Sequence, residues 1–92
     1  MPAKVIFKPA AKRLFKKIPK KDRAQIAAKV DLLAKDPRAA GEEYIKNSGG
    51  VYRVREGDYR VAYVRQSGRI VVVHIGNRRE IYRALRNAGY IH

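Results

Sequence analysis

Residues 50–83 alternate strand-like segments with turn signals, and this pattern constrains the fold more than any other feature of the chain. Segments 51–56, 59–66 and 69–76 are rich in β-branched and aromatic residues. Glu56-Gly57-Asp58 and Ser67-Gly68 separate them and are typical of tight hairpin turns. The pattern predicts three consecutive antiparallel strands.

Helices are predicted before this region by apolar spacing and by proline. In residues 20–35, Ile26, Val30 and Leu33 recur at helical spacing, which indicates one apolar face. Pro9 suits the first turn of a shorter helix. The remaining expected elements are a first strand over 4–8, that shorter helix over 9–17, a loop over 38–50 and a C-terminal helix over 79–87.

These elements follow the order β-α-α-β-β-β-α. They predict an α+β fold of two layers, with a helical hairpin packed on a small, largely antiparallel four-stranded sheet. A length of 92 residues predicts a single domain over 1–92.

The net charge of +14 indicates a nucleic acid, a ribonucleoprotein or an acidic protein as partner. Up to Lys46 most basic residues are lysines, and after it all are arginines. Arginine holds its charge at any physiological pH and binds phosphate through a planar, two-pronged group. The chain has no cysteine, and no apolar run approaches the about 18–20 residues of a membrane span. We therefore expect a cytoplasmic protein that has no membrane partner.

The length of the first turn decides which way the arginines point. Side chains alternate across a strand, so Arg53 and Arg55 share one face. A two-residue turn at Gly57 adds Arg60 to that face and leaves Val54 and Val61 on the other. We expect this turn, because a three-residue loop would turn Arg60 toward the core. The face that carries Arg53, Arg55 and Arg60 is called the arginine face below.

Alternation along segment 69–76 makes a second prediction about the two faces. Val71, Val73 and Ile75 are expected on the arginine face, whereas Val72 and His74 are expected to face the helical hairpin. His74 is therefore interpreted as a packed core residue. Because the strand is apolar on both sides, both sides are expected to be covered.

Further functional residues follow the end of this strand. Arg78 and Arg79 come where a strand gives way to a helix, so at least one can approach Arg60. Tyr82 lies one turn further on and can offer a ring for base stacking and a hydroxyl for hydrogen bonding.

With these residues in view, the chain resembles the RelE/ParE superfamily of toxin–antitoxin toxins. The paired motifs GDYRVAY, residues 57–63, and GNRREIYR, residues 76–83, carry the resemblance. It extends over nearly the whole chain, including the lysine-rich helical hairpin.

The resemblance implies a RelE-like toxin that cleaves messenger RNA in the ribosomal A site. In such toxins the 2′-hydroxyl attacks the adjacent phosphate, without a metal ion or other cofactor, and translation is inhibited. The implied partners are a cognate antitoxin and the ribosome, with its ribosomal and messenger RNA. The implied catalytic residues are Arg53, Arg55, Arg60, Arg78 and Tyr82. The candidate RNA-binding residues are Arg79, Arg83, Lys16, Lys17, Lys20 and Lys21.

The sequence departs from the best-known RelE proteins, which carry lysines where this chain has Arg53 and Arg55. Arginine is a poorer proton acceptor than lysine. Tyr82, a 2′-hydroxyl arranged by the ribosome, and one of the arginines all stay open as the source of base catalysis. The alternatives to a nuclease are a ParE-like toxin that inhibits DNA gyrase and a module that only binds nucleic acid or antitoxin.

Overall fold

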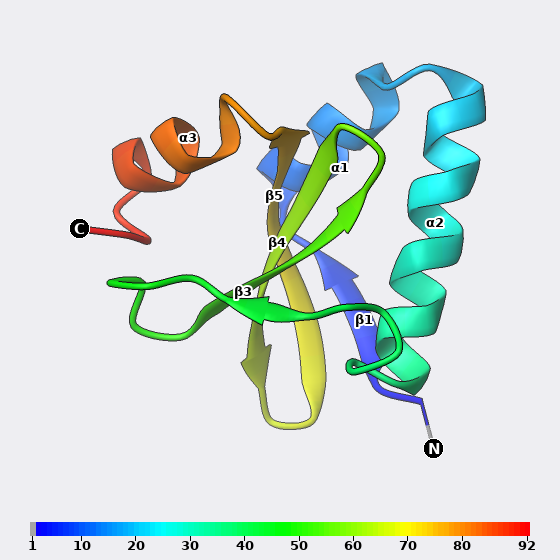
Figure 1. The fold of residues 1–92 in the computed structure, drawn as a ribbon, viewed down its shortest axis with the longest axis horizontal. Coiled ribbons are helices and arrows are strands. Elements are labelled where there is room, and N and C mark those ends of the chain that lie inside the picture. Colours follow the sequence, from blue (N-terminus) through cyan, green and yellow to red (C-terminus); the bar gives the residue numbers. More distant parts are fainter. Residues whose placement is uncertain (1) are drawn as a thin grey trace.

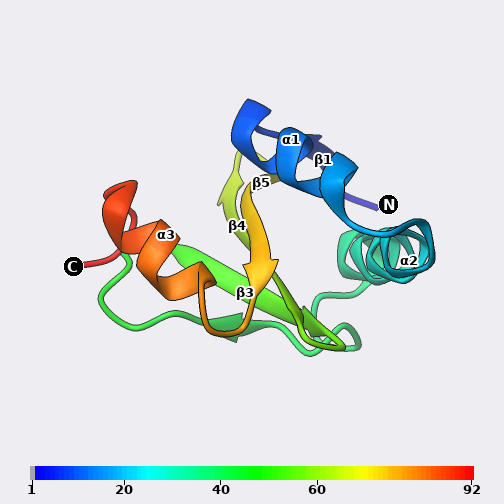
Figure 2. The same cartoon turned by 90° about the horizontal axis from the view of Figure 1, so that it is seen from above.

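The computed structural model describes residues 2–92 as a five-stranded sheet with helices on both faces (Figures 1 and 2). The elements are β1 (Lys4–Phe7), α1 (Pro9–Lys17), α2 (Lys20–Lys35), β2 (Glu43–Tyr44), β3 (Val51–Glu56), β4 (Tyr59–Gln66), β5 (Arg69–Asn77) and α3 (Ile81–Asn87). The strand order is β1-β5-β4-β3-β2. Strands β2 to β5 pair antiparallel, and β1 pairs parallel with β5.

The predicted α+β class is confirmed, and the number of strands is corrected from four to five. The additional strand, β2, lies in the segment predicted as a loop over 38–50. It has two residues, and it pairs Glu43 with Arg53 and Tyr44 with Tyr52. A pairing this short leaves no alternating pattern in the sequence, so the strand is found only through its partner.

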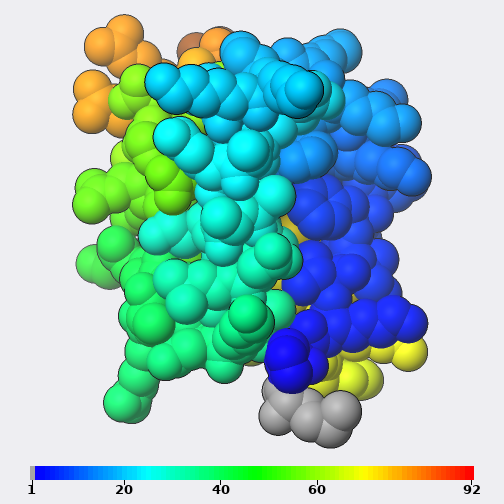
Figure 3. Space-filling model, turned by 90° about the vertical axis from the view of Figure 1, so that its right-hand side faces the viewer, coloured from blue at the N-terminus to red at the C-terminus, as the bar shows by residue number. Residues whose placement is uncertain are grey.

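Prolines begin both helices of the hairpin. Pro9 lies in the first turn of α1, and Pro19 is the N-cap residue of α2. Ile26, Val30 and Leu33 are the buried residues of α2, as their spacing predicts. Figure 3 shows how much of one side of the molecule this helix covers.

The core is divided into two parts by the sheet. On the hairpin face, Val54, Val61, Tyr63 and Val72 pack with the buried residues of α1 and α2. On the arginine face a second cluster joins the sheet to the C-terminal segment; it contains Ile45, Val51, Ala62, Val73, Ile81, Leu85 and Ile91. Helix α3 thus covers part of the face opposite the hairpin, as Figure 2 shows from above.

The two turns of the meander have the geometry that their glycines favour. Glu56 pairs with Tyr59, so the first turn has two residues, as predicted. Gly57 has a φ of 59°, which suits the first position of a type II′ turn. In the second turn Ser67 and Gly68 have φ values of 50° and 75°, the pattern of a type I′ turn.

A β-bulge in β5 contradicts part of the predicted face assignment. Ala62 pairs with His74 and Tyr63 pairs with Val72, so Val73 is the extra residue. Beyond the bulge the alternation is reversed. Ile75 therefore packs on the hairpin face rather than the arginine face. His74 lies on the arginine face, opposite to its predicted direction.

None of the helices in residues 2–92 is long and apolar enough to cross a membrane.

Candidate functional site

The β3–β4 register brings three of the predicted arginines together. Arg55 pairs directly with Arg60, and Arg53 pairs with Ala62 one row away. Directly paired residues of antiparallel strands have Cβ atoms about 5 Å apart on the same face. Because Arg53, Arg55 and Arg60 share a face, the sheet itself concentrates three positive charges.

Arg60 occupies the centre of this arrangement and is buried. Its residue is only 8% exposed, and no other charged residue among those described is as buried. Its Nη1 donates hydrogen bonds to the carbonyl oxygens of Gly57, at 3.2 Å, and Tyr59, at 3.1 Å. These bonds anchor the guanidinium to the first turn of the meander, so its position is set by backbone geometry.

The electrostatic surroundings of Arg60 are mainly positive. Burial, together with the charges of Arg53, Arg55 and Arg78, lowers the pKa of the Arg60 guanidinium, whereas Tyr82 acts in the opposite direction. Within residues 2–92, no carboxylate forms a salt bridge with Arg60. A buried cation without a counter-ion is costly, because its lost hydration is not replaced by a negative charge. This position therefore favours an anionic ligand.

The segment after β5 holds Arg78 beside this cluster. The backbone N–H of Arg78 donates to the carbonyl oxygen of Asp58 at 3.0 Å. The Oδ1 atom of Asn77 accepts hydrogen bonds from the backbone N–H groups of Arg79 and Glu80. This side-chain cap shapes the chain reversal before α3. The backbone of Arg78 is therefore bonded to the β3–β4 turn, which the Arg60 side chain also contacts.

Tyr82 is half-buried against the cluster under α3 and is close enough to Arg60 to affect its pKa. The structure thus brings Arg53, Arg55, Arg60, Arg78 and Tyr82 into one neighbourhood. Arg53 has a partner that the sequence did not indicate, since its Nη2 lies 3.1 Å from the Glu43 carboxylate of β2.

The predicted RNA-binding residues are all exposed, and Arg79 lines a surface hollow together with Asp58, Asn77 and Arg78. Arg79 and Arg83 are exposed and are not among the groups that shift the pKa of Arg60. Lys16, Lys17, Lys20 and Lys21 are exposed where α1 gives way to α2.

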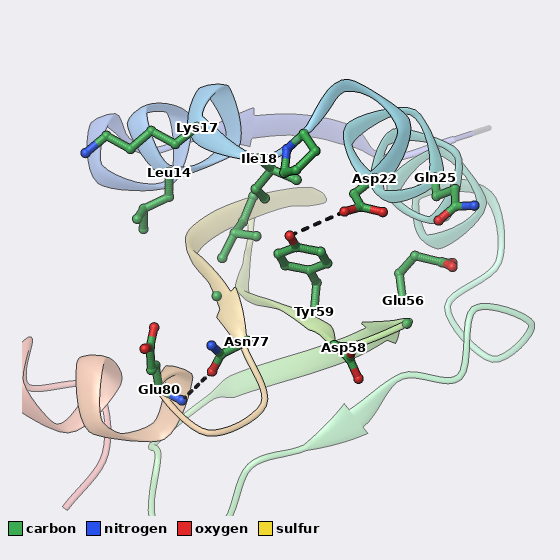
Figure 4. Close-up of a pocket in the computed structure, with 14 residues that line it drawn as sticks. Leu14, Lys17, Ile18, Asp22, Gln25, Glu56, Asp58, Tyr59, Asn77 and Glu80 are labelled. Atoms are coloured by element: carbon green, nitrogen blue, oxygen red, sulfur yellow. Dashed lines mark hydrogen bonds between the residues drawn. The ribbon is translucent and has the colours of Figure 1, made fainter.

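A pocket of about 520 Å³ lies between the helical hairpin and the β3–β4 turn (Figure 4). Lys17 is on one side of it, and four of the chain's eight acidic residues are in its lining: Asp22, Glu56, Asp58 and Glu80. Tyr59 faces Asp22 across it, with 3.5 Å between the hydroxyl and carboxylate oxygens. Burial and the carboxylates of Asp22 and Asp58 raise the pKa of Tyr59. Lys17 therefore shares this pocket with four carboxylates, and none of the clustered arginines lines it.

His74 is a polar residue of the arginine face that sequence reasoning assigned to the wrong side. It pairs with Ala62, which pairs in turn with Arg53, so the three form one row across the sheet. The residue is half-buried, and burial lowers the pKa of its imidazole. Only the bulge at Val73 reveals this placement, because residues 70–75 are an unbroken run without glycine or proline to signal it.

Comparison with known proteins identifies the class of protein. The family model described as the ParE toxin of the type II toxin–antitoxin system, parDE, matches residues 5–82. That match covers most of the chain, from β1 to the first turn of α3. The chain therefore belongs to the ParE toxin family, within the RelE/ParE superfamily, and is a toxin of a type II toxin–antitoxin system. No curated protein sequence matches the chain.

Solved structures share the fold at low sequence identity. A free E. coli RelE toxin, with two arginines replaced by alanine, has 18% identity and a TM-score of 0.77, over 97% of this chain and 99% of that one. The RelBE2 toxin–antitoxin complex from Mycobacterium tuberculosis has a chain with 22% identity and a TM-score of 0.71, covering 85% and 100%. The YoeB dimer from Staphylococcus aureus has 20% identity and a TM-score of 0.66, covering 80% and 94%.

Proposed function

We propose that this toxin is a ribosome-dependent endoribonuclease that cleaves messenger RNA in the ribosomal A site and so inhibits translation. The observation that carries the proposal is Arg60, a buried guanidinium with cationic neighbours and no salt bridge within residues 2–92. A phosphodiester supplies the negative charge that this position lacks, and guanidinium groups bind it through paired hydrogen bonds.

The proposed reaction is an attack by the 2′-hydroxyl on the adjacent phosphate. It leaves a 2′,3′-cyclic phosphate on one fragment and a 5′-hydroxyl on the other, and it consumes no cofactor. The phosphate gains negative charge as the attack proceeds. Arg53, Arg55 and Arg78 are close enough to Arg60 to lower its pKa, which supports a role for the four arginines in stabilising that charge. Fixed cations aimed at a developing charge are among the strongest contributions to catalysis.

The ribosome is the proposed location of the reaction. The exposed lysines at the α1–α2 connection offer flexible charges to ribosomal RNA, which need no precise geometry. The arginine cluster would then hold the messenger RNA. Arg79 and Arg83 extend the positive charge along the start of α3.

A cognate antitoxin with an acidic amphipathic segment is the proposed protein partner. The net charge of +14 favours such a segment. The RelBE2 structure from M. tuberculosis and the RelB–RelE structure from Methanococcus jannaschii are both complexes of toxin with antitoxin. We propose that the segment occupies the arginine face or displaces α3, and that the toxin acts in the cytoplasm.

Primer extension on messenger RNA that is being translated in vitro tests the proposal. The purified toxin should produce new RNA ends in register with codons, only when ribosomes are present. Arg78→Ala should abolish most of this cleavage. Arg69→Ala is the matched control, because Arg69 is exposed at the opposite end of β5.

The same preparation should be assayed for inhibition of DNA gyrase supercoiling. Inhibition of gyrase without RNA cleavage would contradict the nuclease proposal and support the ParE-like alternative. Absence of growth arrest when the toxin is expressed alone would instead support a protein that only binds.

A further inference from the structure

The bulge in β5 gives the arginine face an imidazole in addition to its arginines. Ala62 separates His74 from Arg53 in one row of the sheet. The neighbouring row consists of Arg55, Arg60 and Gly76. His74 and Gly76 are two residues apart beyond the bulge, so they are on the same face.

The imidazole leans over Gly76, toward the row of Arg60. The point that a Cβ atom of residue 76 would occupy lies 3.9 Å from Cδ2 and 4.0 Å from Nε2 of His74. The Cβ atom of Ile81 is also 3.9 Å from that point. Gly76 pairs with Arg60, and cross-strand partners have Cβ positions about 5 Å apart, so the imidazole leans toward the row from which Arg60 projects. Gly76 has no side chain to block the path.

The charged and titratable groups on this face are mainly cationic. Strand β3 contributes Arg53 and Arg55, β4 contributes Arg60, and the segment around α3 contributes Arg78 and Tyr82. Glu43 of β2 brings a carboxylate to this face, where it is paired with Arg53, and Glu80 is the N-cap residue of α3. Burial lowers the pKa of His74, because the uncharged imidazole loses less hydration than the imidazolium. A neutral imidazole can accept a proton at neutral pH.

We propose that His74 is the general base that removes the proton of the attacking 2′-hydroxyl. The inference rests on the proposed nuclease function. It assigns the general base, which the arginines of the site do not supply. An arginine is too weak a base at neutral pH for this step.

The proposed step balances as follows. The 2′-oxygen forms a bond to phosphorus as its proton passes to Nε2 of His74. The bond between phosphorus and the 5′-oxygen breaks, and that oxygen takes a proton from the hydroxyl of Tyr82. The imidazolium then loses its proton to water and the phenolate gains one from water, so both side chains return to their starting state.

Single-turnover cleavage of ribosome-bound messenger RNA, measured from pH 5.5 to 8, tests this assignment. The wild-type rate should rise with pH below about 6.5 and level off above, because the His74 pKa is lowered from its ordinary value of about 6.5. His74→Gln should lower the rate by about 10²–10⁴-fold and remove the rise. Ribosome binding by that variant should be unchanged. His92→Gln is the matched control, because His92 is exposed at the C-terminus.

A second variant protects the test against a folding artefact. His74→Ala should regain activity when free imidazole is added, with a thermal melting curve like that of the wild type. Failure of imidazole to restore this folded variant would overturn the role of His74. So would wild-type rates or an unchanged pH profile in His74→Gln while the wild type cleaves RNA. Absence of cleavage by the wild type itself would overturn the nuclease proposal, and this role with it.

Discussion

The two faces of the sheet differ in how their buried polar side chains are paired. On the hairpin face the fully buried Tyr63 donates its hydroxyl hydrogen to Glu42, and Glu42 also pairs with Arg65. Arg65 lies over the Tyr52 ring, 4.4 Å from its centroid, in a cation–π arrangement. On the arginine face Arg60 is buried among cations and has no such carboxylate in the described chain. The buried polar groups of the hairpin face are thus paired within the fold, whereas on the arginine face Arg53 is paired with Glu43 but the buried Arg60 forms no salt bridge within residues 2–92.

The sharpest test of this comparison is Arg60→Met, which keeps the volume and removes the charge. We expect cleavage to fall by about 10²–10³-fold, the usual effect of losing one donor to a transition-state charge. The free energy of unfolding should stay the same or increase, because a buried cation without a salt bridge is removed. Cleavage assays and urea denaturation measure the two effects. A clear loss of stability together with normal cleavage would make Arg60 structural.

Tyr63→Phe makes the opposite change on the hairpin face. The hydrogen bond to the Glu42 carboxylate is lost, and hydrogen bonds to charged groups contribute about 1.5–3 kcal/mol. We expect the free energy of unfolding to fall by about that amount while cleavage is retained. Tyr52→Phe, which alters the ring stacked on Tyr63, is the control and should change stability little.

Burial and Glu42 raise the pKa of Tyr63 above its usual value of 10.0. The stability that depends on its protonated hydroxyl is therefore fully present below about pH 10 and is lost progressively as the pH rises toward the higher folded-state pKa.

The lysines at the α1–α2 connection should affect binding without affecting the chemical step. Replacing Lys16, Lys17, Lys20 and Lys21 together by glutamine removes four exposed charges. Each phosphate contact contributes about one unit to the salt dependence of RNA binding. We expect the slope of log affinity against log salt to fall by up to about four units, with an unchanged cleavage rate at saturation. A slower cleavage rate at saturation would instead give these lysines a part in the chemical step.

The smallest effect expected is on the pH dependence of stability. Because burial lowers the pKa of His74, the unfolded chain binds its proton more readily than the folded chain. Stability from the neutral imidazole is therefore present above about pH 6.5 and lost as the pH falls through the folded-state pKa. Urea denaturation at several pH values should show a smaller acid loss for His74→Gln than for the wild type. An equal loss of stability at acid pH in the two proteins would indicate that His74 is solvated in the folded state rather than packed against α3.

Much of the site could be predicted because strand alternation and turn length are local properties. The two-residue turn at Gly57 follows from the residues around it, and it alone places Arg60 beside Arg55. The direction of His74 could not be predicted in this way. Its face depends on where the extra residue of a long strand is accommodated, and that is decided by packing on both sides of the sheet.

The sequence by itself determined the helical hairpin, the three-strand meander, the strong positive charge and the arginines that share a face. These follow from residue type and spacing within a few positions of the chain. Only the tertiary structure decided that Arg60 is buried without a salt bridge in residues 2–92, that β2 brings Glu43 to Arg53 and that the bulge turns His74 to the arginine face. Each of these depends on contacts between distant segments, where burial and charge are set by the partners that the fold brings together.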